Sequence, residues 1–324
     1  MLIIGFEGKE PPSSRHPFVS GFISFARNLG TLDEIAEQNR ALAALAGPDE
    51  PPLILSIDQE GGRVQRIRAP LIVWPPMAEI GKKSVEQAEW TGAKLAEQIF
   101  ALGFNVDYAP VLDVHSNPAN PIIGDRAFST DPFVAATMAL AFWRGLEKNG
   151  VRGCGKHFPG HGDTATDSHL ELPVVDKSLD QLRACELVPF VEAARARVPL
   201  MMTAHVVYPQ VDALPATMSR RWLTDILRGE LGYEGVIVSD DLDMKAVADG
   251  FPLEQVILDG LRAGVDAFLA CRDVAVQQRA IEILERAHRD DATLRARIDD
   301  ATRRITAFRR TLGAPTRPWR EVIR

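Results

Sequence analysis

Three of the seven histidines of the chain lie in one short segment, GCGKHFPGHGDTATDSHLELP, which spans residues 153–173. Its residues with possible chemical roles are His157, His161, Asp163, Asp167 and His169. Glycine adopts unusual backbone angles and proline lacks a backbone donor, so the segment is predicted to be a connector rather than a helix. Histidine titrates near neutral pH, which suits it to accept and donate protons in catalysis.

Four interpretations of this segment compete. The first is structural, with turns at the prolines and glycines and with Asp167 and Ser168 as caps. The second is a metal site built from His157, His161 and an aspartate, but HFPGH cannot be helical and the chain contains no HExxH motif. The third, a Ser-His-Asp hydrolase, would require a GxSxG motif, which is absent from the sequence. In the fourth, His169 is a general acid and base oriented by Asp167, on a connector that closes over substrate.

A second stretch, LGYEGVIVSDDLDM at residues 231–244, favours the fourth interpretation. It delivers Asp240 directly out of an apolar run. A carboxylate held there beside cations would stay ionised and could attack a carbon centre. Glycoside hydrolysis with retention requires such a nucleophile and a separate proton donor. Histidine is an unusual donor in that reaction, but its ordinary pKa lies close to the operating pH.

Elements of alternating type must position these residues. Eight short apolar runs are predicted as strands, at residues 2–6, 19–25, 53–57, 104–109, 151–155, 199–204, 235–239 and 266–270. Amphipathic helical patterns lie between most of them. Their predicted start signals are Thr31, Ser84, Ser178 and Asp131 with Pro132, and their predicted end signals are Gly47, Gly103 and Gly150. This alternation predicts an α/β fold, a (β/α)8 TIM-type barrel over residues 1–312 followed by a tail over 313–324. An open doubly wound sheet is the alternative, but no GxGxxG follows the first strand.

Ionisable residues lie at or near the carboxyl ends of five of the predicted strands. They are Asp58, Asp107, Lys156 with His157, His205, and Asp240 with Asp241. Any one of them alone could be a helix cap or a loop acceptor. Together they predict an active site at the carboxyl-terminal rim of the barrel, where such enzymes build their sites.

The composition limits the classes of partner. The 324 residues are 46% hydrophobic and 25% charged, as in a soluble globular protein, and the net charge of -7 argues against a nucleic-acid partner. The three cysteines show no CxxC spacing, which indicates free thiols in a reducing compartment. No signal peptide or membrane span is predicted, so we expect a cytoplasmic protein without membrane partners.

Four separated motifs together carry a family resemblance. KHFPGHGDTATDSHLELP, IDQEGGRVQR, GDRAFS and ILRGELGYEGVIVSDDLDM occur in the expected order. The chain resembles the β-N-acetylglucosaminidases of glycoside hydrolase family 3, of the NagZ type, from about residue 1 to residue 310. Ala127 stands where the GDRSF motif of the family has serine, but the arginine of that motif is retained.

The resemblance implies roles for individual residues. Asp240 matches the catalytic nucleophile, His169 the general acid and base, and Asp167 its partner. Residues that match the sugar-binding positions are Asp58, Arg66, Arg126, Lys156 and His157. Arg63 lies in the same loop without an implied ligand contact, and it could pair with an acid such as Glu60. Asp241 is expected to cap a helix or support its neighbour.

The implied activity is hydrolysis, with retention, of terminal N-acetylglucosamine from muropeptides during peptidoglycan recycling. The resemblance implies a carbohydrate substrate and a cytoplasmic location, and we expect a monomer with no metal or other cofactor. A phosphorylase or a β-glucosidase-like enzyme on the same barrel is an alternative. A sugar-binding protein without turnover is another, but binding alone would not require both Asp240 and the Asp167–His169 pair.

Overall fold

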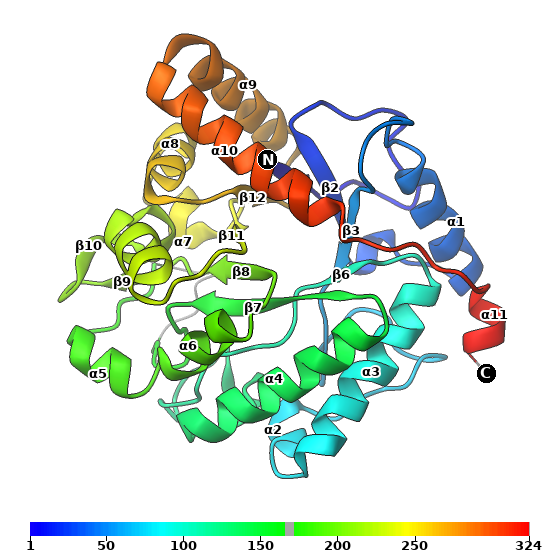
Figure 1. Cartoon of the computed structure of the whole chain (residues 1–324), viewed down its shortest axis with the longest axis horizontal. Coiled ribbons are helices and arrows are strands. Elements are labelled where there is room, and N and C mark those ends of the chain that lie inside the picture. Colours follow the sequence, from blue (N-terminus) through cyan, green and yellow to red (C-terminus); the bar gives the residue numbers. More distant parts are fainter. Residues whose placement is uncertain (166–171, 324) are drawn as a thin grey trace.

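The structure of the protein is a computed structural model that describes residues 1–165 and 172–323. Eight parallel strands form a closed barrel with helices around its outside (Figure 1). The strands are β1 (Leu2–Ile4), β2 (Val19–Ser24), β3 (Ile54–Ile57), β6 (Val106–Asp107), β7 (Arg152–Phe158), β8 (Leu200–Thr203), β11 (Val236–Asp241) and β12 (Ala267–Ala270). They pair in chain order around the ring, and β1 closes it against β12. The predicted (β/α)8 barrel is therefore confirmed, and the doubly wound alternative is excluded.

The barrel strands are apolar because both of their faces are covered. Nearly every residue of the eight strands is buried, by barrel interior on one side and by helices on the other. In β2, Gly21 permits the close approach of β3, since a side-chain carbon there would lie only 2.3 Å from the Ile54 carbonyl oxygen. Continuous apolar runs, rather than alternating ones, are the expected sequence pattern of such strands.

Two strands extend further than the sequence predicts. The fifth barrel strand, β7, continues to Phe158, so Lys156 and His157 lie within it rather than after it. The segment that follows β6 continues to pair with β7 at this point, because the Leu112 N–H donates to the Lys156 carbonyl. The seventh strand, β11, likewise continues to Asp241 and includes Asp240. The polar residues at these two strand ends are therefore held by the sheet itself.

Helices cover the outside of the ring, and α3 and α4 pack side by side (Figure 1). The α-helices are α1 (Leu32–Ala43), α2 (Met77–Ile80), α3 (Val85–Ala101), α4 (Pro132–Lys148), α5 (Leu179–Ala184), α6 (Val188–Arg195), α7 (Lys245–Ala248), α8 (Leu253–Ala263), α9 (Val274–Asp290), α10 (Ala292–Arg309) and α11 (Trp319–Val322), with a π-helix at η4 (Arg221–Glu230). Two small antiparallel pairs join β4 (Gln59–Gly61) to β5 (Val64–Gln65) and β9 (Val207–Tyr208) to β10 (Asp212–Pro215). No helix of the described residues has the length and apolarity needed to cross a membrane.

The predicted helix starts are confirmed. The side chains of Thr31, Ser84, Ser178 and Asp131 each accept a hydrogen bond from a backbone N–H in the first turn of the following helix. Gly103 and Gly150 have φ of 99° and 84°, the left-handed conformation expected after a helix. The prediction for Gly47 was wrong. Helix α1 ends at Ala43, and a short turn bonds Leu45 N–H to the Leu42 carbonyl before Gly47 is reached.

Candidate active site

One pocket opens at the carboxyl ends of the barrel strands. Its volume is about 410 Å³, and its polar lining residues are Asp58, Glu60, Arg63, Arg66, Tyr108, Arg126, Lys156, His157, His161, Asp240, Asp241, Cys271 and Arg272. Six residues predicted from the sequence to form the site are among them: Asp58, Arg66, Arg126, Lys156, His157 and Asp240. Asp167 and His169, the predicted proton-transfer pair, lie outside the described residues. The structure thus brings the predicted nucleophile and all five predicted sugar-binding residues into one pocket.

Asp240 is the penultimate residue of β11. One of its carboxylate oxygens accepts the Asp241 backbone N–H at 2.8 Å. Burial alone would raise the pKa of the Asp240 carboxyl, but the side chains of His157 and His205, together with this N–H, more than offset burial and hold the pKa below its ordinary value. The side chain is therefore an anion at neutral pH.

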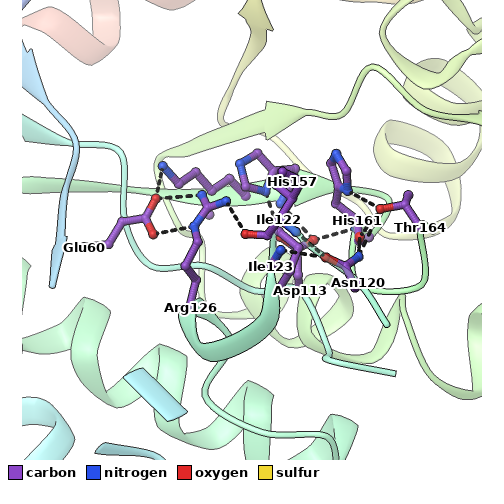
Figure 2. Close-up of polar contacts among 12 residues, drawn as sticks. Glu60, Asp113, Asn120, Ile122, Ile123, Arg126, His157, His161 and Thr164 are labelled. Atoms are coloured by element: carbon purple, nitrogen blue, oxygen red, sulfur yellow. Dashed lines mark hydrogen bonds and ion pairs between the residues drawn. The ribbon is translucent and has the colours of Figure 1, made fainter. Parts of the chain in front are cut away.

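The carboxylates of Asp58 and Glu60 bind three cations in the pocket that Asp240 lines. The Lys156 ammonium lies 3.0 Å from an Asp58 oxygen and 2.6 Å from a Glu60 oxygen. Arg66 donates to the other Asp58 oxygen at 3.1 Å. Arg126 forms a two-pronged pair with Glu60, both contacts being 2.9 Å, and Figure 2 shows these two side chains facing each other. This arrangement fixes each charged group in place before any ligand arrives.

The network keeps Asp58, Glu60 and Lys156 charged. Burial would raise the pKa of the Asp58 and Glu60 carboxyls, but the paired cations outweigh it and lower both, that of Glu60 to about 2. Burial would lower the pKa of Lys156, but the two carboxylates raise it above its ordinary value. Arg66 still has a buried Nε without a partner among the described residues. Such an array offers fixed donors and acceptors to a ligand rich in hydroxyl groups.

Two histidines of the segment at residues 153–173 contact each other beside this network. The His157 and His161 rings are arranged edge to face, with centroids 5.8 Å apart. His161 Nδ1 lies 2.9 Å from the Thr164 hydroxyl, and burial, with a contribution from His157, lowers the pKa of His161 to about 4. Within residues 1–165 and 172–323, no three His, Cys, Asp or Glu side chains are grouped so as to hold a metal ion.

Three other polar residues at the strand ends support the pocket. His205 is fully buried, and burial lowers its pKa. Its Nε2 lies 3.2 Å from the Asp241 carbonyl oxygen, and its Nδ1 lies 2.9 Å from the Thr217 hydroxyl. The Asp241 carboxylate accepts the N–H groups of Asp243 and Cys271, a supporting role that caps no helix. The Asp107 carboxyl accepts the Gln59 N–H, and burial raises its pKa far above the usual range.

Arg63 has a different partner from the one suggested by the sequence. It pairs with Asp125 at 3.0 Å and donates to backbone carbonyls of residues 121–123. Glu60 was the wrong choice because Arg126 and Lys156 already occupy its oxygens.

Sequence reasoning missed two buried acids of the site. Glu60 entered only as a partner for Arg63, although it lies two residues after Asp58 and is only 1% exposed. Asp113 was not considered, although it interrupts the apolar run YAPVLDV and is fully buried. An acid inside an apolar run is a signal that could have identified Asp113, since such a group requires compensating partners.

The chain is similar to known proteins over most of its length. Residues 7–308 match the family described as "Glycosyl hydrolase family 3 N terminal domain". A "Beta-hexosaminidase" of Pseudomonas aeruginosa is 43% identical over 274 residues, which cover 84% of this chain and 81% of the relative.

Solved structures show the same similarity. NagZ from Neisseria gonorrhoeae in its native form has a TM-score of 0.79 and 32% identity, over 97% of this chain and 98% of NagZ. A family 3 β-N-acetylglucosaminidase from Paenibacillus sp. str. FPU-7 has a TM-score of 0.91 and 35% identity. That match covers 98% of this chain but only 62% of the Paenibacillus protein. The family match over most of the chain, with a relative at 43% identity, leads to one conclusion. The chain belongs to glycosyl hydrolase family 3 and is a glycoside hydrolase of the beta-hexosaminidase type.

Proposed function

We propose that this protein is a retaining β-N-acetylglucosaminidase that removes terminal, non-reducing N-acetyl-β-D-glucosamine from muropeptides in peptidoglycan recycling. The observation that carries the proposal is the position of Asp240. This carboxylate lies one residue before the end of a barrel strand, is ionised, and lines the pocket that contains all five predicted sugar-binding residues.

In the proposed first step, the Asp240 carboxylate attacks the anomeric carbon while the bond to the leaving oxygen breaks. His169 donates a proton to that oxygen, so the leaving group departs as a neutral alcohol and a glycosyl-aspartate forms. In the second step, neutral His169 removes a proton from water, and the resulting hydroxide displaces Asp240. Two inversions give net retention at the anomeric carbon.

The sugar would be held by the charged network. Asp58 can accept hydrogen bonds from hydroxyl groups, Arg66, Arg126 and Lys156 can donate them, and His157 can do either. Because the ion pairs within the network already fix these groups, little entropy is lost when the ligand binds. Contacts to parts of the sugar away from the anomeric carbon can thereby stabilise the transition state.

The roles of His169 and Asp167 are supported by the sequence. Their spacing in DSH places a carboxylate two residues before the histidine, and the segment follows β7, whose Lys156 and His157 line the pocket. The carboxylate would orient the imidazole and stabilise its protonated form. Replacement of His169 tests this role and is treated below.

The substrate class is supported by the relatives named beta-hexosaminidase and by the family resemblance. We propose a cytoplasmic monomer, consistent with the three free cysteines, of which Cys154 and Cys271 are buried. Hydrolysis of 4-nitrophenyl N-acetyl-β-glucosaminide, compared with the matching glucoside, tests the requirement for the 2-acetamido group. Faster cleavage of the glucoside would contradict the proposal.

The covalent step has a direct test. The protein is incubated with an activated 2-fluoro sugar, which slows the second step, and then digested for peptide mass mapping. We expect the label on the peptide that contains Asp240. A label on another residue would refute the assignment of the nucleophile, and sugar binding without any hydrolysis would favour a non-catalytic protein.

A further inference from the structure

A buried carboxylate behind the pocket holds one of its histidines. Asp113 is fully buried and does not line the pocket. One of its oxygens lies 2.7 Å from His157 Nδ1, and the other accepts the backbone N–H groups of His157 at 3.2 Å and His161 at 2.6 Å. Figure 2 shows Asp113 among these residues. A single side chain therefore fixes both the backbone and the ring of His157.

These contacts determine which ring nitrogen carries the proton. Burial would raise the pKa of the Asp113 carboxyl, but His157 and the His161 N–H more than offset it and keep the pKa below its usual value. An ionised carboxylate only accepts hydrogen bonds, so Nδ1 of His157 must be the donor in the 2.7 Å contact. The ring lines the pocket, and its Nε2 has no hydrogen bond to any described residue. In the neutral ring, Nε2 is therefore an acceptor available to a ligand.

We infer that Asp113 is a positioning residue of this enzyme: it sets the tautomer and the orientation of His157, so that Nε2 of the neutral ring meets a sugar hydroxyl as an acceptor. Asp113 acts through His157 and does not itself contact the substrate. Asp113 lies outside the pocket wall, and the effect of its replacement on catalysis rests on the proposed function.

The surroundings of Asp113 hold it in one position. Asn120 donates to the His161 carbonyl at 2.9 Å and to the Thr164 hydroxyl at 3.0 Å, while its side-chain oxygen accepts the N–H groups of Ile122 and Ile123. The hydrogen bonds of Asn120 thereby connect the loop after β6 to the turn after β7, next to Asp113 (Figure 2). A carboxylate held between two such segments has little freedom to release the ring.

The isosteric substitution Asp113→Asn distinguishes positioning from mere filling of space. The asparagine oxygen should take the place that accepts two backbone N–H groups, because the opposite orientation would point an amide donor at both of them. The NH2 group would then face His157 Nδ1, which would have to become the acceptor. The proton moves to Nε2, and the nitrogen that faces the ligand changes from an acceptor to a donor in the neutral ring.

The first measurement uses the wild-type protein and long-range proton–nitrogen NMR correlations of its histidine rings, with His157→Gln to assign the signal. We expect the neutral His157 ring to carry its proton on Nδ1 in the wild type and on Nε2 in Asp113→Asn. A proton on Nε2 in the wild type would overturn the inference, whether or not the variant folds. Glu186→Gln is the matched control, since Glu186 is also a fully buried acid near this turn, and it should leave the His157 signal unchanged.

The second measurement is a double-mutant cycle on kcat/KM for 4-nitrophenyl N-acetyl-β-glucosaminide. Asp113→Asn should lower kcat/KM about 10- to 100-fold in the wild type, the range for one hydrogen bond to a charged group. In a His157→Ala background, the same substitution should lower it by less than about threefold, because its effect passes through His157. Equal losses in both backgrounds would overturn the positioning role. Absence of hydrolysis by the wild type would instead refute the proposed function, and the NMR result would still decide the tautomer.

Discussion

The Glu60 carboxylate offers a quantitative test of the charged network. It is 1% exposed and binds Arg126 through both oxygens and Lys156 through one. The substitution Glu60→Gln keeps the size of the side chain and removes its charge. It leaves two buried cations, with Asp58 as their nearest remaining acid in the network. We expect a large loss of stability together with a loss of activity.

The expected magnitude follows from the pKa of the Glu60 carboxyl. Folding lowers it from 4.5 to about 2, which corresponds to about 3 kcal/mol of stabilisation at neutral pH. Removal of one partner from a buried ion pair independently costs about 3 to 5 kcal/mol. Because the folded pKa is the lower one, the stabilisation is complete above about pH 4.5 and is lost as the pH falls through about 2. About half of it should remain at pH 3.

The assay is urea unfolding at pH 7 and pH 3, followed by circular dichroism, for the wild type and Glu60→Gln. The matched control is Glu282→Gln, because Glu282 pairs with Arg279 at 2.9 Å where both side chains are exposed. The control should lose less than about 1 kcal/mol at either pH. The electrostatic account of the network would be refuted if Glu60→Gln lowered the free energy of unfolding by less than about 1 kcal/mol at pH 7. It would also be refuted if the decrease were the same at pH 7 and pH 3.

Four further outcomes are expected. Asp240→Asn should abolish nearly all activity on aryl and natural substrates while its circular dichroism spectrum matches that of the wild type, and substantial turnover would exclude it as the nucleophile. His169→Ala should reduce bond cleavage of a substrate with a poor leaving group by about 10² to 10⁴ and of an aryl glycoside much less; equal single-turnover losses would contradict proton donation. Burial raises the pKa of the Asp241 carboxyl from 3.8 to about 7, so its ionisation disfavours the folded state as the pH rises through this window. The wild type should therefore lose about 2 to 3 kcal/mol relative to Asp241→Asn between pH 5 and pH 8, and a constant difference in urea unfolding would count against this shift. Treatment with a chelator should leave kcat/KM unchanged, and a loss restored by added metal would revive the metal-site interpretation.

Much of the fold was predictable from local patterns. Eight apolar runs with helical patterns between them identify the barrel, because a parallel sheet covered on both faces requires such runs. The helix starts at Thr31, Ser84, Ser178 and Asp131 depend only on contacts within one turn, and all four were predicted. The end of α1 was not, since a turn rather than Gly47 satisfies its carbonyls.

The site was predicted less completely. Of the residues expected at the rim, Asp58, Lys156, His157, Asp240 and Asp241 line one pocket, whereas Asp107 and His205 do not. Arg66 and Arg126, which the family resemblance implied, line it as well. The extension of β7 through His157 was not expected, because it depends on hydrogen bonds to the segment that follows β6. Arg63 pairs with an acid, as expected, but that acid is Asp125 rather than Glu60. The sequence does not show that other cations already occupy the oxygens of Glu60.

The sequence by itself determined the alternation that specifies a barrel, the caps that begin its helices, and the set of ionisable residues at the strand ends. Tertiary structure alone decided which of these charges neutralise one another. The pairs Asp113–His157, Glu60–Arg126 and Asp58–Lys156 join residues 44, 66 and 98 positions apart. Their contacts depend on how closed strands and loops direct side chains into one small volume. Burial there makes the pKa of each group depend on neighbours that are distant in the sequence, and local patterns contain no information about them.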